Sequence, residues 1–404
     1  MKPFQSRYET KLALFFLLIA ATFGLLLRLM YVLPVPANYK FLLHTHSHIA
    51  MLGWMYFAII FLLKKHLIPR VVNRTPYRLN LIITTISVFG MMFSFPFTGY
   101  ALISIVSSSL FIFTTYHLCY LVFKDLKVAK LLRSTKKLIN FGLIFLIISS
   151  IGPWSLSAIM ASGNSGSSLY SNAIYFYLHF MYNGFLVFML IALLTHHFSS
   201  VVKSVKQLDS SISILVFSGF STVILSFLWN IDNQVFHVIG LVVALLQLYG
   251  FIKFYRSFDL EMIKASLKKR SGVFKLVIWI ILLSFMAKLL LQILSSCPWI
   301  VGESIVNRDF VIGYIHLVFL GFISFSLFGL LFYSQQSKLL FKFASTLFLI
   351  GFIGTEMMLF VRGGFPLLFT QKSITWLLIV FSAFLTLGSL LYLILEYRQV
   401  RRLS

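Results

Sequence analysis

Twelve long stretches of apolar residues run through this sequence, separated by short segments that hold most of its charged residues. A helix needs about 20 mostly apolar residues to cross the hydrocarbon core of a bilayer, and each stretch is long enough to do so. The predicted spans are residues 11–33, 44–63, 79–97, 101–123, 138–159, 172–195, 212–230, 234–255, 274–296, 309–333, 340–361 and 373–396. We therefore expect an all-α fold, a polytopic bundle of 12 transmembrane helices that forms a single transmembrane domain over residues 1–404.

Composition excludes a soluble fold. Hydrophobic residues make up 59% of the chain and charged residues 11%, whereas a soluble domain carries about 25% charged residues. The first apolar stretch follows Lys2, Arg7 and Lys11 and continues to Pro34 without a small-residue cleavage site. This pattern predicts a retained span rather than a signal peptide.

The basic residues are distributed asymmetrically along the predicted topology. A formal net charge of +24 would be compatible with nucleic-acid binding. With the N-terminus inside, however, the internal ends and loops hold 28 of the 34 Lys and Arg residues. This positive-inside pattern is typical of membrane proteins, and it also favours contact with anionic lipid headgroups. We therefore expect the chain to contact a lipid bilayer and no nucleic acid. We expect it to lie in a bacterial inner membrane with both termini cytoplasmic.

Six of the ten histidines fall in the outer half of the predicted spans, namely His44, His46, His48, His179, His237 and His316. Ionisable residues at membrane depth are costly and are usually functional. Neutral imidazole binds iron, copper and zinc, and two imidazoles on facing helices can hold a heme iron axially. Because His44 and His48 are four residues apart, they share a helix face, whereas His46 points nearly the opposite way. The set predicts metal or heme binding.

Three of these histidine segments resemble the large catalytic subunit of the heme-copper oxidases, in particular its nitric oxide reductase and cbb3-type branch. Residues 43–46, Leu-His-Thr-His, resemble the Leu-His-Thr-Asn opening of the branch's second helix. Residues 312–321, from Ile312 to Gly321, resemble its Gly-His-Val-His-Met-Ala-Phe-Trp-Gly run in the tenth helix. Residues 179–184, from His179 to Gly184, resemble the His-Leu-Trp-Val-Glu-Gly segment of the sixth helix.

The resemblance implies a site for one low-spin heme b. Its axial ligands would be His44, with His48 as the competing choice, and His316 from the tenth helix. Tyr314 stands where the family has the ligand of its high-spin heme. Few cations remain at the outer side for the heme propionates, and Arg308 and Arg362 are the candidates because guanidinium groups pair well with carboxylates.

The resemblance is less complete at the family's second metal centre. His179 matches the metal-binding histidine of the sixth helix, but Asn183 replaces the glutamate that follows it. The seventh helix ends in Trp229 and Asn230 where the family has adjacent histidines, and His237 is the remaining candidate for a second nitrogen. A tightly held iron or copper ion normally needs more nitrogen ligands than these, so we expect the binuclear site to be lost.

Three hypotheses about function follow. The first is a membrane heme protein with a retained low-spin site, acting in electron transfer or in heme or gas handling. The second is an active nitric oxide or oxygen reductase, with its electrons supplied by a partner subunit or by quinol. The third is a cofactor-free transporter or assembly factor whose histidines are packing or proton-relay groups. A reduced-minus-oxidised absorbance spectrum separates the first two from the third.

Overall fold

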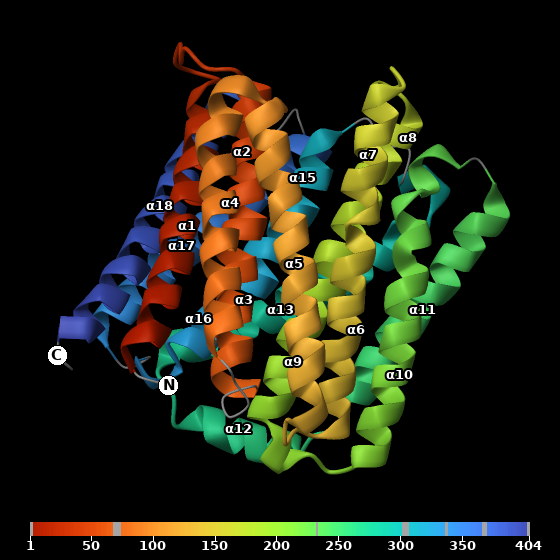
Figure 1. Cartoon of the computed structure of the whole chain (residues 1–404), viewed down its shortest axis with the longest axis vertical. Coiled ribbons are helices and arrows are strands. Elements are labelled where there is room, and N and C mark those ends of the chain that lie inside the picture. The colour runs from red at the N-terminus through yellow and green to blue at the C-terminus, as the bar shows by residue number, and fades with distance from the viewer. Residues whose placement is uncertain are drawn as a thin grey trace. The chain divides into compact units, whose positions relative to one another are not determined.

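The computed structural model describes residues 3–67, 74–231, 233–300, 307–335, 338–365 and 370–401, which are mainly helical (Figure 1). Within them, 12 helices are long and apolar enough to cross a membrane, as the sequence predicted. The β-structure found in the described residues is one isolated antiparallel bridge, between Val202 and Phe258. The second span begins at Tyr39, five residues before the predicted start, because the Asn38 side chain accepts hydrogen bonds from the backbone of Lys40 and Phe41 and caps the helix.

The chain divides into two compact units, each described here by itself. Unit 1 comprises Met1–Asp125, Arg270–Leu282 and Asp309–Ser404, and unit 2 comprises Leu126–Lys269 and Leu283–Arg308. The helices of unit 1 are α1 (Pro3–Leu29), α2 (Tyr39–His48), α3 (Tyr56–Leu62), α4 (Arg74–Thr98), most of α5 (Leu102–Val128), α15 (Arg308–His316), α16 (Phe325–Leu331), α17 (Leu339–Gly364) and α18 (Gln371–Arg401). Those of unit 2 are α6 (Arg133–Ser149), α7 (Ile151–Ala161), α8 (Ser168–Leu178), α9 (Val187–His197), α10 (Val205–Ser221), α11 (Gln234–Tyr255) and α12 (Leu260–Lys268), and α13 (Gly272–Leu294) contributes to both.

In unit 1, α18 packs along both α17 and α1 (Figure 1). Glycines allow the close approach of α17 and α18, since a Cβ on Gly351 would lie 2.7 Å from the backbone oxygen of Phe381. Small residues at helix contacts are typical of membrane bundles, where backbones pack closely. Farther along the same pair, the ring of Tyr392 is buried and its hydroxyl lies 2.7 Å from that of Ser345.

In unit 2, α10 packs along α11, and α6 packs against the span that contains α8 and α9. A Cβ on Gly184 in that span would lie 2.7 Å from the Phe145 side chain of α6. The short helix α12 lies outside the spans, in a segment that the sequence analysis treated as a loop. Its first turn is capped by the Asp259 side chain, and it carries Lys264 and Lys268.

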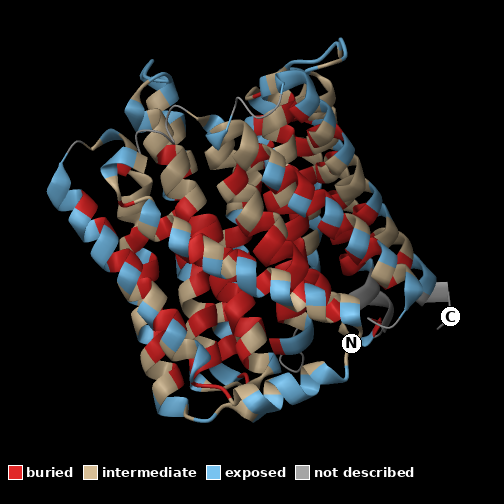
Figure 2. Ribbon diagram, turned by 180° about the vertical axis from the view of Figure 1, so that it is seen from behind, coloured by how far each residue is buried: buried red, intermediate tan, exposed pale blue. Residues whose placement is uncertain are grey.

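Three spans change from α-helix to π-helix at or directly after a histidine. The π-helical segments that begin there are η1 (Ile49–Met55), η3 (His179–Leu186) and η7 (Leu317–Ser324), and a further one, η2 (Leu63–Leu67), ends the span that contains η1. A π-helical turn holds more residues than an α-helical turn, so it changes the face on which the following side chains lie, and such turns often occur at functional sites. These three segments are largely buried, whereas residues at the helix ends are more often exposed (Figure 2).

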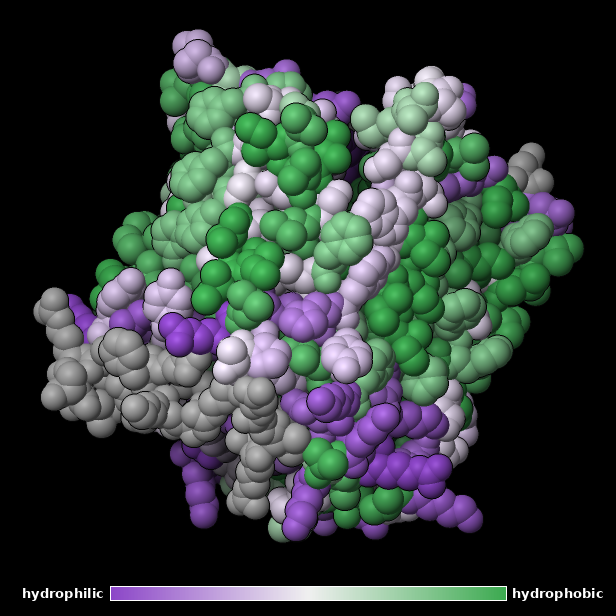
Figure 3. Space-filling model, viewed as in Figure 1, coloured by the Kyte–Doolittle hydropathy of each residue, from purple (hydrophilic) through white to green (hydrophobic). Residues whose placement is uncertain are grey.

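The surface fits a membrane environment. Many large apolar side chains are exposed along the spans, such as Phe93, Phe113 and Trp279. On the face drawn in Figure 3, hydrophobic residues cover the length of the helices and hydrophilic residues gather at their lower ends. The chain is therefore an integral membrane protein.

Candidate functional site

His46 is held in place by α1. Its Nδ1 lies 2.9 Å from the backbone oxygen of Ala20, and a Cβ on Gly24 would lie 3.0 Å from the Cε1 atom of the imidazole. A carbonyl oxygen can only accept a hydrogen bond, so Nδ1 carries the proton and donates it. The lone pair is then on Nε2, which is the arrangement found in many histidines that bind a metal ion through Nε2.

His316 faces His46 from the end of α15, where the span turns into the π-helical segment η7. The centroids of the two imidazoles are 6.4 Å apart and the ring planes are at 89°. The Nδ1 of His316 is buried and has no hydrogen-bond partner. A ligand nitrogen lies about 2 Å from its metal, so two imidazoles on opposite sides of one ion have centroids about 6 Å apart. The observed spacing fits a single metal ion held between the two rings.

Two charged side chains of unit 1, Arg28 and Glu356, belong to the surroundings of this histidine pair. The guanidinium of Arg28, on α1, lies within electrostatic range of both imidazoles and of Glu356 on α17. Within the described residues, Arg28 forms no ion pair. Both carboxyl oxygens of Glu356 are buried without a hydrogen-bond partner, and one would lie 3.8 Å from a Cβ on Gly313. The site therefore combines two imidazoles with an unpaired guanidinium and an unpaired carboxyl group.

The sequence predicted that His44 or His48 pairs with His316, whereas the ring that the structure places beside His316 is that of His46. The His44 ring lies 4.8 Å from that of Tyr100, and the His48 ring lies 4.7 Å from that of Phe95. Successive residues of an α-helix are about 100° apart, so a helix that turns His46 toward α1 turns His44 and His48 away from it. The helical period separates the two faces, and the predicted ligands lie on the face opposite to that of His46.

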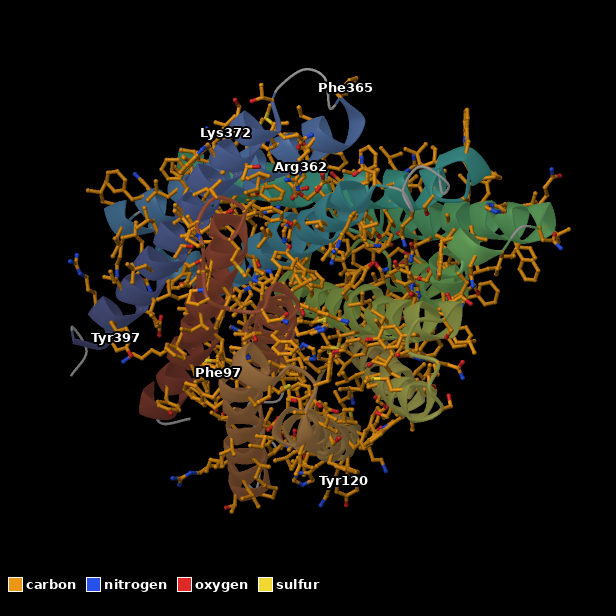
Figure 4. All side chains as sticks on the ribbon, turned by 90° about the horizontal axis from the view of Figure 1, so that it is seen from above. Phe97, Tyr120, Arg362, Phe365, Lys372 and Tyr397 are labelled. Atoms are coloured by element: carbon orange, nitrogen blue, oxygen red, sulfur yellow. The ribbon has the colours of Figure 1, made fainter. Side chains whose placement is uncertain are left out.

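Arg308 and Arg362, the predicted partners of the heme propionates, lie in different surroundings. Arg362 forms a two-bond ion pair with Asp309, with its Nε 2.6 Å from Oδ2. In the view from above, Arg362 lies farther inside the molecule than Phe365, which is at its edge (Figure 4). Arg308 is exposed at the start of α15. Tyr314 is half-buried and lies two residues before His316, so it is on another face of the same helix.

The predicted metal ligands His179 and His237 belong to unit 2 and are both buried. The Nε2 of His179 lies 3.0 Å from the backbone oxygen of Gly219, and the Nδ1 of His237 lies 2.9 Å from that of Ser296. Each ring therefore donates one N–H to the backbone and keeps one nitrogen for another partner. In the part of the chain that the structure describes, no three His, Cys, Asp or Glu side chains gather as a metal site.

Sequence reasoning missed Arg28 and the cradle that α1 forms for His46. Arg28 could have been found as a basic residue near the outer end of an otherwise apolar span. Ala20 and Gly24 are four residues apart, and this spacing puts two small residues on one face of α1, where a neighbouring ring can approach closely. Nothing in the sequence, however, shows which neighbour that ring belongs to.

No protein-family model and no curated protein matches the sequence. In structure, the chain is similar to a heme-copper terminal oxidase dimer determined by cryo-electron microscopy. The TM-score is 0.67 at 13% sequence identity, over 97% of this chain and 84% of that chain. The chain therefore has the fold of a heme-copper oxidase, as the resemblance predicted. Its place in the nitric oxide reductase and cbb3-type branch stays a prediction.

Proposed function

We propose that this protein binds one heme b between His46 and His316 and acts in electron transfer across or along the membrane. The observation that carries the proposal is the position of the two imidazoles, whose centroids are 6.4 Å apart with their planes nearly perpendicular, and the hydrogen bond from Nδ1–H of His46 to Ala20. This bond leaves the Nε2 of His46 free to bind iron. The fold likeness to a heme-copper terminal oxidase supports a heme in the bundle.

The residues around the pair fit a heme. A heme carries two propionate groups, and Arg28 is a guanidinium near both imidazoles that forms no ion pair within the described residues. The Arg362 guanidinium is already paired with Asp309, so Arg28 is the stronger candidate of the two for a propionate. The two cysteines, Cys119 and Cys297, form no Cys-x-x-Cys-His motif. A heme in this chain would therefore be held without thioether bonds, as heme b is.

Two imidazole ligands favour electron transfer over gas reduction. A heme iron with a histidine on each side has no open position for oxygen or nitric oxide, and it supplies one-electron chemistry. His46 is hydrogen-bonded to the backbone of α1, so it is a poor candidate for an axial ligand that oxygen or nitric oxide displaces from the iron. Heme or gas handling stays as an alternative within the same proposal.

The reductase hypothesis finds less support in unit 2. His179 donates Nε2–H to Gly219 and keeps Nδ1 for a metal ion, but in the described residues it belongs to no cluster of three metal-binding side chains. Trp229, where the family has a histidine, donates its indole N–H to Asn172 2.9 Å away. Asn183, at the position of the family's glutamate, is a neutral amide and a weak metal ligand. The cofactor-free hypothesis predicts no heme spectrum at all.

A reduced-minus-oxidised absorbance spectrum of the purified protein tests the proposal. We expect the sharp α band of a low-spin heme in the wild type, and pyridine extraction should identify heme b. The band should be lost in His46→Phe and in His316→Phe. Matched controls on the same helix, His44→Phe and His48→Phe, should keep it.

Two outcomes would contradict the proposal. One is a wild-type protein that shows no α band after expression with sufficient heme. The other is a band that survives both His46→Phe and His316→Phe. Loss of the band in His44→Phe alone would instead return the axial role to the ligand that the sequence resemblance implied.

A further inference from the structure

The face of α2 that turns away from His46 carries two histidines for which the proposed heme site has no use. His44 and His48 are four residues apart in a segment that is regular α-helix from Tyr39 to His48. The π-helical turns begin only at Ile49, so the α-helical spacing of the pair is intact. Two histidines at this spacing place their rings on one side of a helix, as in the His-x-x-x-His pairs that bind metal ions.

The nitrogen atoms of this pair are in states suited to metal binding. The Nδ1 of His48 lies 2.8 Å from the backbone oxygen of His44, so it donates its proton there and its Nε2 carries the lone pair. The Nε2 of His44 is buried and has no hydrogen-bond partner. A buried polar nitrogen without a partner is destabilising, so its position is unfavourable unless something binds it.

Aromatic rings form the walls of this site. The imidazole of His44 lies 4.8 Å from the ring of Tyr100 and 6.3 Å from that of Phe95, measured between centroids. The imidazole of His48 lies 4.7 Å from Phe95 and 6.1 Å from Tyr100. Aromatic packing alone would explain the flat rings, since phenylalanine would fill the same space. It does not explain two imidazoles at a chelating spacing with one nitrogen left unpartnered.

We infer that His44 and His48 form a binding site for a single copper(I) ion, separate from the site between His46 and His316. Imidazole nitrogen is a good ligand for copper and zinc. Zinc normally takes four ligands, whereas copper(I) is stable with two. In the described residues these two imidazoles are joined by no third histidine, cysteine or carboxylate.

Charge also favours a monovalent ion. His44 lies within electrostatic range of the exposed ammonium of Lys40, and among the described residues no acidic side chain forms an ion pair with either histidine. Transfer of an ion into a partly buried site costs more as its charge rises. A single positive charge on two neutral imidazoles is therefore easier to accommodate than a divalent ion. The inference does not depend on the proposed heme.

Copper binding to the full-length protein in detergent tests the site. The protein is stripped with a chelator, equilibrated under argon with copper(I) and a competing chromogenic chelator, and analysed for metal after gel filtration. We expect one tightly held copper per wild-type chain. His44→Phe and His48→Phe keep an aromatic ring, so both variants should fold. Each should weaken copper affinity at least about tenfold, because even the loss of a residue that only hydrogen-bonds to a metal ligand typically has an effect of this size.

His66→Phe, which changes an exposed histidine near the other end of the same span, is the matched control and should bind copper as the wild type does. His46→Phe should also keep its copper, which separates this site from the proposed heme site. X-ray absorption of the copper-loaded wild type should show nitrogen ligands with the scattering pattern of imidazole. The inference is overturned if the wild type retains no stoichiometric copper, if both histidine variants match it, or if zinc(II) binds in preference to copper(I).

Discussion

Gly24 offers a test of the proposed heme site that leaves both imidazoles in the chain. In Gly24→Ala, the new Cβ would lie 3.0 Å from Cε1 and 3.3 Å from Nδ1 of His46. Ordinary van der Waals contact begins at 3.4 Å, so the ring must retreat by a few tenths of an ångström. The retreat strains the 2.9 Å bond from Nδ1 to Ala20, which sets the tautomer and the direction of the ring.

The expected effect is larger on heme binding than on stability. Weakening this hydrogen bond costs about 1 kcal/mol, whereas replacing Gly by Ala inside a helix gains about the same amount. The unfolding temperature should therefore change little. Loss of a partner that orients a metal-binding histidine typically lowers metal affinity about 10–100-fold, and we expect a decrease in this range for heme.

Gly329→Ala is the matched control. Gly329 is also a helical glycine of unit 1, but a Cβ there would meet nothing within 4 Å. The assay is titration of the heme-free protein with heme, followed by the α-band absorbance, alongside thermal unfolding in detergent. Equal heme affinity and equal spectra for Gly24→Ala and Gly329→Ala would refute the argument that α1 holds His46 for iron.

Three further predictions concern the bundle and its orientation. Glu9→Gln should destabilise the protein by about 3 kcal/mol, because it leaves Lys64, whose Nζ lies 2.7 Å from the carboxylate, without its charge partner in a largely buried site; thermal unfolding should show part of this loss restored when Lys64 is also neutralised. Gly351→Ala should destabilise by about 1–3 kcal/mol in the same measurement, since its Cβ would lie 2.7 Å from a backbone oxygen of α18, and a gain in stability would contradict this packing. On intact cells, a membrane-impermeant maleimide should label Ser165→Cys but not Lys268→Cys, and the reverse pattern would contradict cytoplasmic termini.

The membrane spans were predictable because their signal is local. About 20 apolar residues in a row suffice to define a span, whatever the neighbouring helices are. Helix ends were less predictable, since they depend on single contacts such as the cap that Asn38 provides for α2. The short helix α12 was missed because its nine residues include several charges, so it has no continuous apolar stretch.

The candidate site was predictable in its residue types but not in its pairing. The helical period alone separated His46 from His44 and His48. Which of the two faces meets His316 depends on where α1 and α15 pack around α2. Two features of α1 decide this, namely the backbone oxygen of Ala20, which accepts a hydrogen bond from His46, and the lack of a side chain at Gly24, which leaves room for the imidazole. Such contacts leave almost no mark on a hydropathy pattern.

The sequence by itself determined a membrane bundle of 12 spans, the concentration of histidines in a few of them, and the division of α2 into two histidine faces. These properties follow from local composition and from the geometry of one helix. Only the tertiary structure decided that His46 faces His316, that Arg28 lies beside them, and that His44 and His48 share an aromatic enclosure. These are contacts between residues far apart in the chain, and they arise when helices pack against one another.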